Sequence, residues 1–281
     1  MSAARVIVVS DSHLSARTPE ATAHWDALVE HVAAAAPDLV VHAGDISTDG
    51  EVVPEDLAYA RTQLDRIAAP LAVLPGNHDI GDGAAWTYDG AAVVGAETLG
   101  RYHAAFGPDR FSVEVGAWRL LGVNAQLFGS GEPEEDEHWA WIGDEIGRVA
   151  PGTPVGLVLH KPLVPPDGDR DRPARYVPEP ARRRLLALLA AVDTRLVVSG
   201  HIHQALRRDR DGVAHVWAPS SWAILPDRIQ SPIGAKWVGA TGLALHDDGR
   251  VDVSDIRLPG VDDVVIGDDV PSPYGAIPPL D

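Results

Sequence analysis

Clusters of Asp, His and Asn along the chain have the composition of a metal site. Each cluster directly follows a short apolar run, and the set comprises Asp11-x-His13, Gly44-Asp45, Gly76-Asn77-His78-Asp79, His160 and Gly200-His201-x-His203. Carboxylate, amide and imidazole donors without sulfur favour Mn, Fe, Zn or Co. The chain contains no Cys, which excludes thiolate ligands, disulfides and thiol nucleophiles. The sequence therefore predicts an oxygen- and nitrogen-ligated metal centre.

The apolar runs that precede these clusters predict buried β-strands. The five strands are expected over residues 6–9, 39–41, 71–74, 155–159 and 195–199. Helical patterns separate the first three, and this β-α-β-α-β order predicts parallel strands with right-handed crossovers. The carboxyl ends of parallel strands share one sheet edge, so ligands far apart in sequence can meet there. Because Asp-x-His and His-x-His place ligands two residues apart, an extended backbone would point both side chains the same way.

Further elements follow from local patterns. Thr18-Pro19-Glu20 predicts a helix start with a capping hydroxyl, and Pro37 ends that helix. The other helices are expected over residues 54–68, 135–149 and 180–192. Antiparallel strands are expected over residues 111–115, 118–123, 205–208, 213–217, 238–245 and 251–256. We predict one domain with two sheets over residues 1–258 and an irregular tail over residues 259–281.

The ordered set of clusters resembles the calcineurin-like metallophosphoesterase superfamily over residues 6–203. The resemblance implies a four-layer α/β/β/α sandwich, in which two mixed sheets pack face to face with helices outside. It also implies two metal ions. Asp11, His13 and His203 would hold one ion, Asn77, His160 and His201 would hold the other, and Asp45 would bridge both.

The resemblance implies a reaction as well. A hydroxide bridging the two ions would attack a phosphate ester in line. His78 would face the phosphate and stabilise the transition state or protonate the leaving group, and Asp79 would orient that imidazole. The size and motif order resemble small bacterial members, such as class III cyclic-nucleotide phosphodiesterases and glycerophosphodiesterases. A soluble phosphodiesterase acting on a small diester is the leading hypothesis, with a phosphomonoesterase or protein phosphatase as the alternative and a non-catalytic scaffold as a disfavoured third.

Substrate contacts are less specified by the sequence. Arg175 and Tyr176 lie in an irregular segment after His160, and Arg175 could pair with a substrate phosphate. The competing interpretation is a surface arginine that balances Asp167, Asp169 and Asp171. Trp222, next to a turn, is the tryptophan expected to line a cleft.

The net charge of −18 limits the classes of partner. Proteins that coat nucleic acid or anionic membranes need a basic face. The negative charge therefore disfavours nucleic acid and membranes as partners, and it disfavours a nuclease activity. No apolar run approaches the length of a bilayer span, and the N-terminus lacks a signal-peptide core. We therefore expect a cytoplasmic enzyme with a small phosphate-ester substrate, and the sequence leaves a homodimer open.

Overall fold

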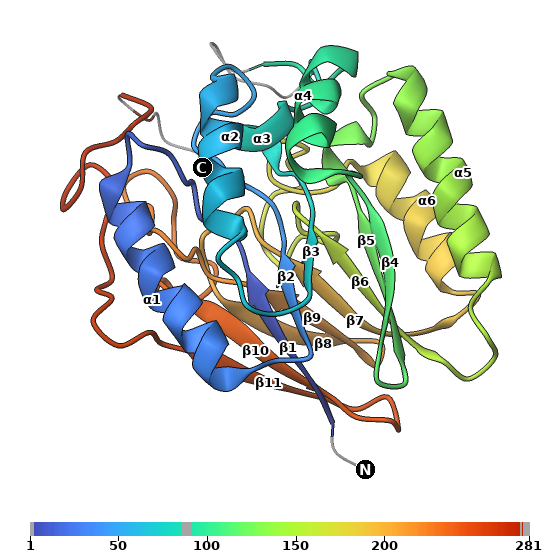
Figure 1. The fold of residues 1–281 in the computed structure, drawn as a ribbon. Helices are drawn as coiled ribbons and strands as arrows, with labels where there is room; N and C mark the ends of the chain where they lie inside the picture. Colours follow the sequence, from blue (N-terminus) through green and yellow to red (C-terminus); the bar gives the residue numbers. More distant parts are fainter. Residues whose placement is uncertain (1–2, 86–91, 276, 278–281) are drawn as a thin grey trace.

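Two mixed β-sheets lie face to face in the computed structural model, which describes residues 3–85, 92–275 and 277 (Figure 1). The first sheet has the order β11 (Val251–Ile256), β10 (Ala240–Leu245), β1 (Ala4–Val9), β2 (Leu39–His42) and β3 (Leu71–Val73). The second has the order β4 (Phe111–Val115), β5 (Trp118–Val123), β6 (Pro154–Leu159), β7 (Asp193–Ser199), β9 (Val213–Trp217) and β8 (Leu206–Arg210). Strands β1, β2 and β3 are parallel, as are β5, β6, β7 and β9, whereas β4, β8, β10 and β11 join antiparallel.

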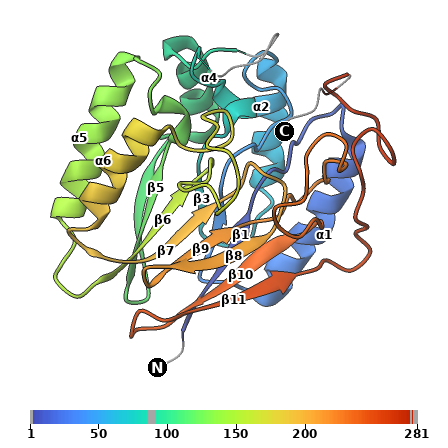
Figure 2. The same ribbon diagram turned by 180° about the vertical axis from the view of Figure 1, so that it is seen from behind.

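Helices cover the outer face of each sheet. They are α1 (Pro19–Ala35), α2 (Pro54–Leu64), α3 (Asn77–Ile80), α4 (Ala96–Phe106), α5 (Pro133–Gly147) and α6 (Glu179–Leu189), with a 3-10 turn η1 at Ala125–Leu127. Figures 1 and 2 show α1 and α2 on one side of the sandwich and α5 and α6 on the other. The predicted four-layer α/β/β/α architecture is confirmed.

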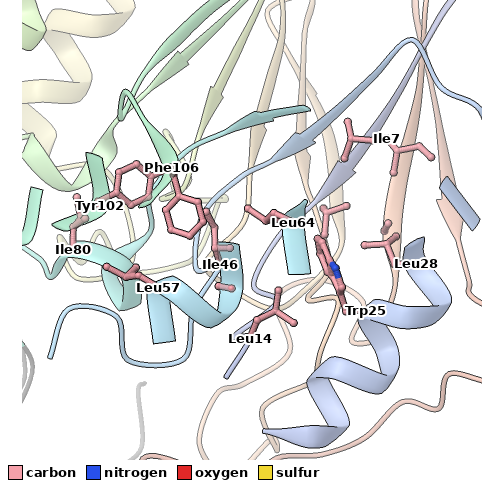
Figure 3. Packing of buried hydrophobic residues seen from close by; sticks show 14 of the residues in the cluster. Ile7, Leu14, Trp25, Leu28, Ile46, Leu57, Leu64, Ile80, Tyr102 and Phe106 are labelled. Carbon is pink, nitrogen blue, oxygen red and sulfur yellow. The ribbon is translucent and has the colours of Figure 1, made fainter. Parts of the chain in front are cut away.

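The alternation of side chains along β1 shows how the layers are held together. Val6 and Val8 point into the apolar core between the two sheets, whereas Ile7 and Val9 point into the core beneath α1, α2 and α4. Figure 3 shows this second core, which includes Trp25 of α1 and Ile7 of β1. A third core joins α5 and α6 to the second sheet. Burial of β1 on both faces fixes its register and therefore the position of the loop that follows it.

Two local predictions differ from the structure. The Thr18 hydroxyl makes no capping bond to α1; it lies 2.9 Å from the carbonyl oxygen of His13 and donates there, which fastens the β1–α1 loop instead. Helix α4 was not predicted, although Leu99, Tyr102 and Phe106 have helical spacing and are buried. The remaining predicted helices and strands are present, with boundaries shifted by a few residues.

The segment after β11 contains turns and two isolated β-bridges, Ile224 to Val265 and Ile266 to Val270. It lies beside α1 in Figures 1 and 2, where it is drawn in red. In the part of the chain that the structure describes, no helix combines the length and the apolar character needed to cross a membrane.

Candidate metal centre

The loops after β1, β2, β6 and β7 bring six of the seven predicted ligands into two adjoining groups. The first group is Asp11, His13 and His203, and the second is Asp45, His160 and His201; within each group the ligand atoms lie within 4.8 Å of one another. The parallel strands belong to two sheets, not to one, and the ligands converge where the carboxyl ends of both sheets meet. Gly200 N donates to the His160 carbonyl at 3.0 Å, which joins two of these loops directly.

Asp45 lies between the two groups. Its Oδ2 is 3.1 Å from His160 Nε2 and 3.9 Å from His13 Nε2, one imidazole from each group. Its Oδ1 accepts the backbone N–H of His78 at 2.9 Å, which fixes the carboxylate plane. The carboxylate is therefore held where a single residue can reach cations on both sides.

The sequence analysis predicted extended backbone for Asp11-x-His13 and His201-x-His203. The structure shows that this prediction is wrong. Asp11, His13, Asp45, His201 and His203 all have positive φ, between 43° and 69°. This left-handed conformation is uncommon outside glycine, although Asp and His tolerate it better than most residues. The side chains in Asp11-x-His13 and His201-x-His203 converge because the backbone turns at both positions. Backbone bonds such as His13 N to the Asp45 carbonyl, at 3.1 Å, hold the turns in place.

Three of the histidines are oriented by backbone carbonyl groups. His160 Nδ1 lies 2.8 Å from Ala43 O, His203 Nδ1 lies 2.8 Å from Ala223 O, and His201 Nε2 lies 2.9 Å from Ala174 O. Because a carbonyl oxygen only accepts, the nitrogen facing it carries the proton. The opposite nitrogen then has a lone pair directed at the cluster, which is the arrangement typical of metal-binding histidines.

His13 differs from the other three histidines. Its Nδ1 lies 2.7 Å from the Tyr274 hydroxyl, and its Nε2 lies 3.2 Å from His203 Nε2. Two imidazole nitrogens at this separation share one proton or one cation, since two lone pairs would repel. Tyr274 gave no signal in the sequence, because the segment after Pro259 has no periodicity that links it to a distant site.

Two buried atoms support a metal at this position. Asn77 Oδ1 and His160 Nε2 are buried without a hydrogen-bond partner in the structure. His160 Nε2 is close to Asp45 Oδ2, but the two are not aligned for a hydrogen bond. An unsatisfied buried polar atom costs about 1–3 kcal/mol, and a bound cation would remove that cost. The donor set, with oxygen and nitrogen atoms only, fits the predicted metals.

Burial and charge set the protonation of the cluster. Burial lowers the pKa of His13 and of His201, which keeps these imidazoles neutral, as metal ligands must be. For His160, burial opposes the charged form, but the Asp45 carboxylate outweighs it and raises the pKa to about 9, so a cation that binds Nε2 must displace a proton from it. Burial likewise acts against ionised Asp45, yet His160 and His78 hold its pKa well below the usual range. The centre therefore concentrates negative charge on Asp45.

Asp79 contacts the loops around the site. Its buried carboxylate accepts hydrogen bonds from Ile46 N at 3.1 Å, Ser47 N at 2.8 Å, Ser47 Oγ at 2.6 Å and Gly76 N at 2.8 Å. These bonds tie the loop after β2 to the loop after β3. The hydrogen bonds thus assign Asp79 to positioning the loops that carry Asp45 and Asn77, whereas the expected contact with the His78 imidazole is not among them.

The two substrate-binding candidates, Arg175 and Tyr176, are buried. Arg175 is 6% exposed and pairs with Asp169 at 3.2 Å, and the Tyr176 hydroxyl also bonds Asp169. Arg175 is therefore not a surface arginine, and its role toward substrate stays a prediction. The same segment reaches the centre through the Ala174 carbonyl described above. Trp222 is 1% exposed and packs on the His13 ring at 5.2 Å between centroids, so it supports a ligand and does not line a cleft.

Glu51 is a buried carboxyl group beside His78 that the sequence analysis did not single out. Its ligand atoms lie within 4.8 Å of those of Asp49 and His78, and its Oε2 has no hydrogen-bond partner in the structure. Burial raises the pKa of Glu51 to about 9, so the carboxyl group is neutral at neutral pH. The surrounding Asp49-Gly50-Glu51 has the composition of an exposed turn, which gave no signal of burial.

The sequence matches the calcineurin-like phosphoesterase family over residues 4–205. This span covers most of the chain, all the strand-end clusters and the seven candidate ligands. The chain therefore belongs to this family and is a metal-dependent phosphoester hydrolase, as the motifs predicted.

Two relatives and one solved structure show how far the similarity extends. The chain is 24% identical over 79% of its length to a 3′,5′-cyclic-nucleotide phosphodiesterase of Nostoc sp., covering 77% of that protein. It is 30% identical over 46% of its length to a glycerophosphodiester phosphodiesterase of Enterobacter lignolyticus, covering 43% of that protein. A purple acid phosphatase from yellow lupin has the same fold, with a TM-score of 0.64, 15% identity, and coverage of 98% of this chain and 56% of the other.

Proposed function

We propose that the chain is a dinuclear-metal phosphodiesterase that acts on a small phosphodiester. The observation that carries the proposal is the position of Asp45, whose Oδ2 faces His160 on one side and His13 on the other. In this proposal Asp11, His13 and His203 hold one ion, Asn77, His160 and His201 hold the second, and Asp45 contacts both. When bound, such a pair of ions activates a water molecule and offsets the charge on phosphate oxygens.

His78 is proposed to act on the substrate. His78 is half-buried, whereas His13 and His160 are buried. His201 is half-buried as well, but its Nε2 is held by the Ala174 carbonyl oxygen, so His78 is the half-buried imidazole left to face an incoming phosphate. The ring lies 4.9 Å from that of His13 between centroids, next to the proposed ligands. A donor at this place can stabilise charge on the phosphate oxygens or give a proton to the leaving alcohol. Asp79 acts indirectly, by holding the loop that presents His78.

The substrate class follows from charge and from the relatives. A net charge of −18 disfavours a polyanion beyond the site itself, which favours a small diester over a nucleic acid. The two relatives act on a cyclic nucleotide and on glycerophosphodiesters, respectively, according to their names. A cyclic nucleotide or a glycerophosphodiester is therefore the proposed substrate.

The test combines metal content with activity on paired substrates. Metal-loaded protein is assayed on bis-p-nitrophenyl phosphate, p-nitrophenyl phosphate, a cyclic nucleotide and a glycerophosphodiester, and we expect diester turnover to exceed monoester turnover. Asp45→Asn should lose both ions and activity. His78→Ala should keep its metal content but slow turnover by about 100- to 10,000-fold, the usual contribution of a general acid.

Three outcomes would contradict the proposal in different ways. Monoester turnover well above diester turnover would favour a phosphomonoesterase or protein phosphatase. Loss of metal from His78→Ala would make His78 a ligand. An Asp45→Asn variant with unchanged metal content would remove the bridging role and the dinuclear assignment with it.

A further inference from the structure

The C-terminal segment is fastened beside the metal centre by several contacts. Ile224 N donates to Val264 O at 2.9 Å, and Ile266 N donates to Ile224 O at 3.0 Å. Ile266 is buried in an apolar cluster with Trp222, and Tyr274 packs against the same cluster. Arg228 adds two hydrogen bonds to Asp268, at 2.6 and 2.7 Å. The segment is thus held on the loop that carries Trp222, next to His13.

Tyr274 uses this anchored position to contact two residues of the centre. Its hydroxyl oxygen lies 2.7 Å from His13 Nδ1 and 3.4 Å from the Thr48 carbonyl oxygen. Its ring lies 4.8 Å from the His78 ring between centroids, with the planes inclined by 38°. One side chain from the end of the chain therefore touches a proposed ligand and the residue proposed to act on substrate.

The direction of the hydrogen bond follows from the surroundings of His13. Its Nε2 faces His203 Nε2 and the Asp45 carboxylate, so a cation in the cluster needs a lone pair on Nε2. The proton of the neutral ring must then be on Nδ1 and point at Tyr274. The Tyr274 hydroxyl oxygen can accept a hydrogen bond from His13 Nδ1–H. The same hydroxyl can donate its own hydrogen to the Thr48 carbonyl oxygen, so the three residues form a continuous hydrogen-bonded series.

We propose that Tyr274 is a positioning residue of the metal centre: its hydroxyl accepts the Nδ1–H of His13 and so fixes the tautomer whose Nε2 binds metal. This inference rests on the proposed function. The Tyr274 hydroxyl thus orients His13 as backbone carbonyl groups orient His160, His201 and His203. Hydrogen bonds of this kind raise the affinity of a metal ligand by about 10- to 100-fold. Only the ion held by His13 depends on Tyr274, because His160 and His201 are oriented by Ala43 and Ala174.

The experiment is a competitive metal titration of the full chain. Metal-free wild type, Tyr274→Phe and Tyr59→Phe are titrated with Zn²⁺ against a chromophoric chelator, and Zn²⁺-loaded samples are examined by ¹⁵N–¹H correlation of the histidine rings. Tyr59→Phe is the matched control, since it removes a hydroxyl that bonds Thr22, at 2.9 Å, between α1 and α2. Tyr274→Phe keeps the ring on His78 and removes only the oxygen.

The expected result is selective. Tyr274→Phe should weaken one of two Zn²⁺ sites by about 10- to 100-fold and lose the protected His13 Nδ1 proton, whereas Tyr59→Phe should match wild type. A Tyr274→Phe isotherm identical to wild type would overturn the inference and leave the proposed function standing. Equal weakening of both sites would also overturn it, because it would show a general structural role. A wild type that binds no Zn²⁺ would overturn the proposed function as well.

Discussion

Replacing Gly76 by alanine adds one methyl group at the point where the loops after β2 and β3 touch. A Cβ built at Gly76 lies 2.1 Å from Asp45 Oδ1, 2.4 Å from Asp45 N and 2.7 Å from His160 Nε2, whereas ordinary contact begins at 3.4 Å. Gly76 has φ −110° and ψ −171°, an extended conformation that alanine also adopts. The effect of the substitution is therefore a steric one on the centre and not backbone strain.

The size of the effect follows from these distances. Rotation of the Asp45 side chain cannot relieve the contact with its backbone nitrogen, so one loop must move by about 1 Å, a displacement that commonly costs about 100-fold in rate. Overpacking of this kind lowers the free energy of unfolding by about 1–3 kcal/mol. The displaced Asp45 carboxylate can no longer reach both ligand groups, and we expect at least one of the two ions to bind more weakly.

The assay measures kcat/KM on bis-p-nitrophenyl phosphate, metal content and urea unfolding for Gly76→Ala beside a control. Gly100→Ala is the control, because Gly100 lies inside α4 and an added Cβ meets nothing within 4 Å. It should leave activity unchanged and raise stability by about 0.5–1 kcal/mol. A Gly76→Ala variant with full activity and both ions would show that the contact between these loops does not set the geometry of the centre.

Two further predictions concern residues that support the site and the second sheet. Asp79→Asn places an amide N–H against backbone donors and leaves at least one buried N–H of Ile46, Ser47 or Gly76 unpaired. Burial raises the pKa of Asp79 to about 6, so the carboxyl group is ionised at pH 8. Urea unfolding at pH 8 should show that the substitution lowers the free energy of unfolding by about 1–3 kcal/mol. An unchanged unfolding midpoint would contradict the positioning role. His138 Nε2 accepts the backbone N–H of Asn124 at 3.1 Å, and burial lowers its pKa to about 4. Between pH 6.5 and 4 the unfolded state binds the extra proton, so stability falls as the pH drops through this window, by up to about 3 kcal/mol. His138→Gln should unfold with a shallower pH dependence, and an equal slope in both proteins would refute this assignment.

Local patterns predicted the buried strands and the ligand types, whereas the four-layer architecture followed from the family resemblance. Buried parallel strands are short apolar runs such as Val6 to Val9, and each such run is followed by residues whose chemistry is plain from their type. Helix α4 was missed although its spacing was readable, since glycines precede and interrupt it. The loop contacts of Asp79 were not predicted, for a different reason. The partners of a buried carboxylate depend on which loops meet, and only the tertiary structure shows that Asp79 joins two of them.

The conformation of the ligand loops is the feature that sequence patterns are least able to show. Left-handed backbone at a residue other than glycine costs on the order of 1 kcal/mol or more, and five proposed ligands have it. That cost is offset by bonds between loops, such as Asp11 N to Gly44 O at 3.0 Å and His201 N to Asp11 Oδ2 at 3.0 Å. The second of these bonds forms only when both sheets are assembled, since Asp11 follows β1 of the first sheet and His201 follows β7 of the second. The packing of the two sheets therefore creates the centre, and a change that loosens the core between them, far from any ligand, would weaken metal binding first.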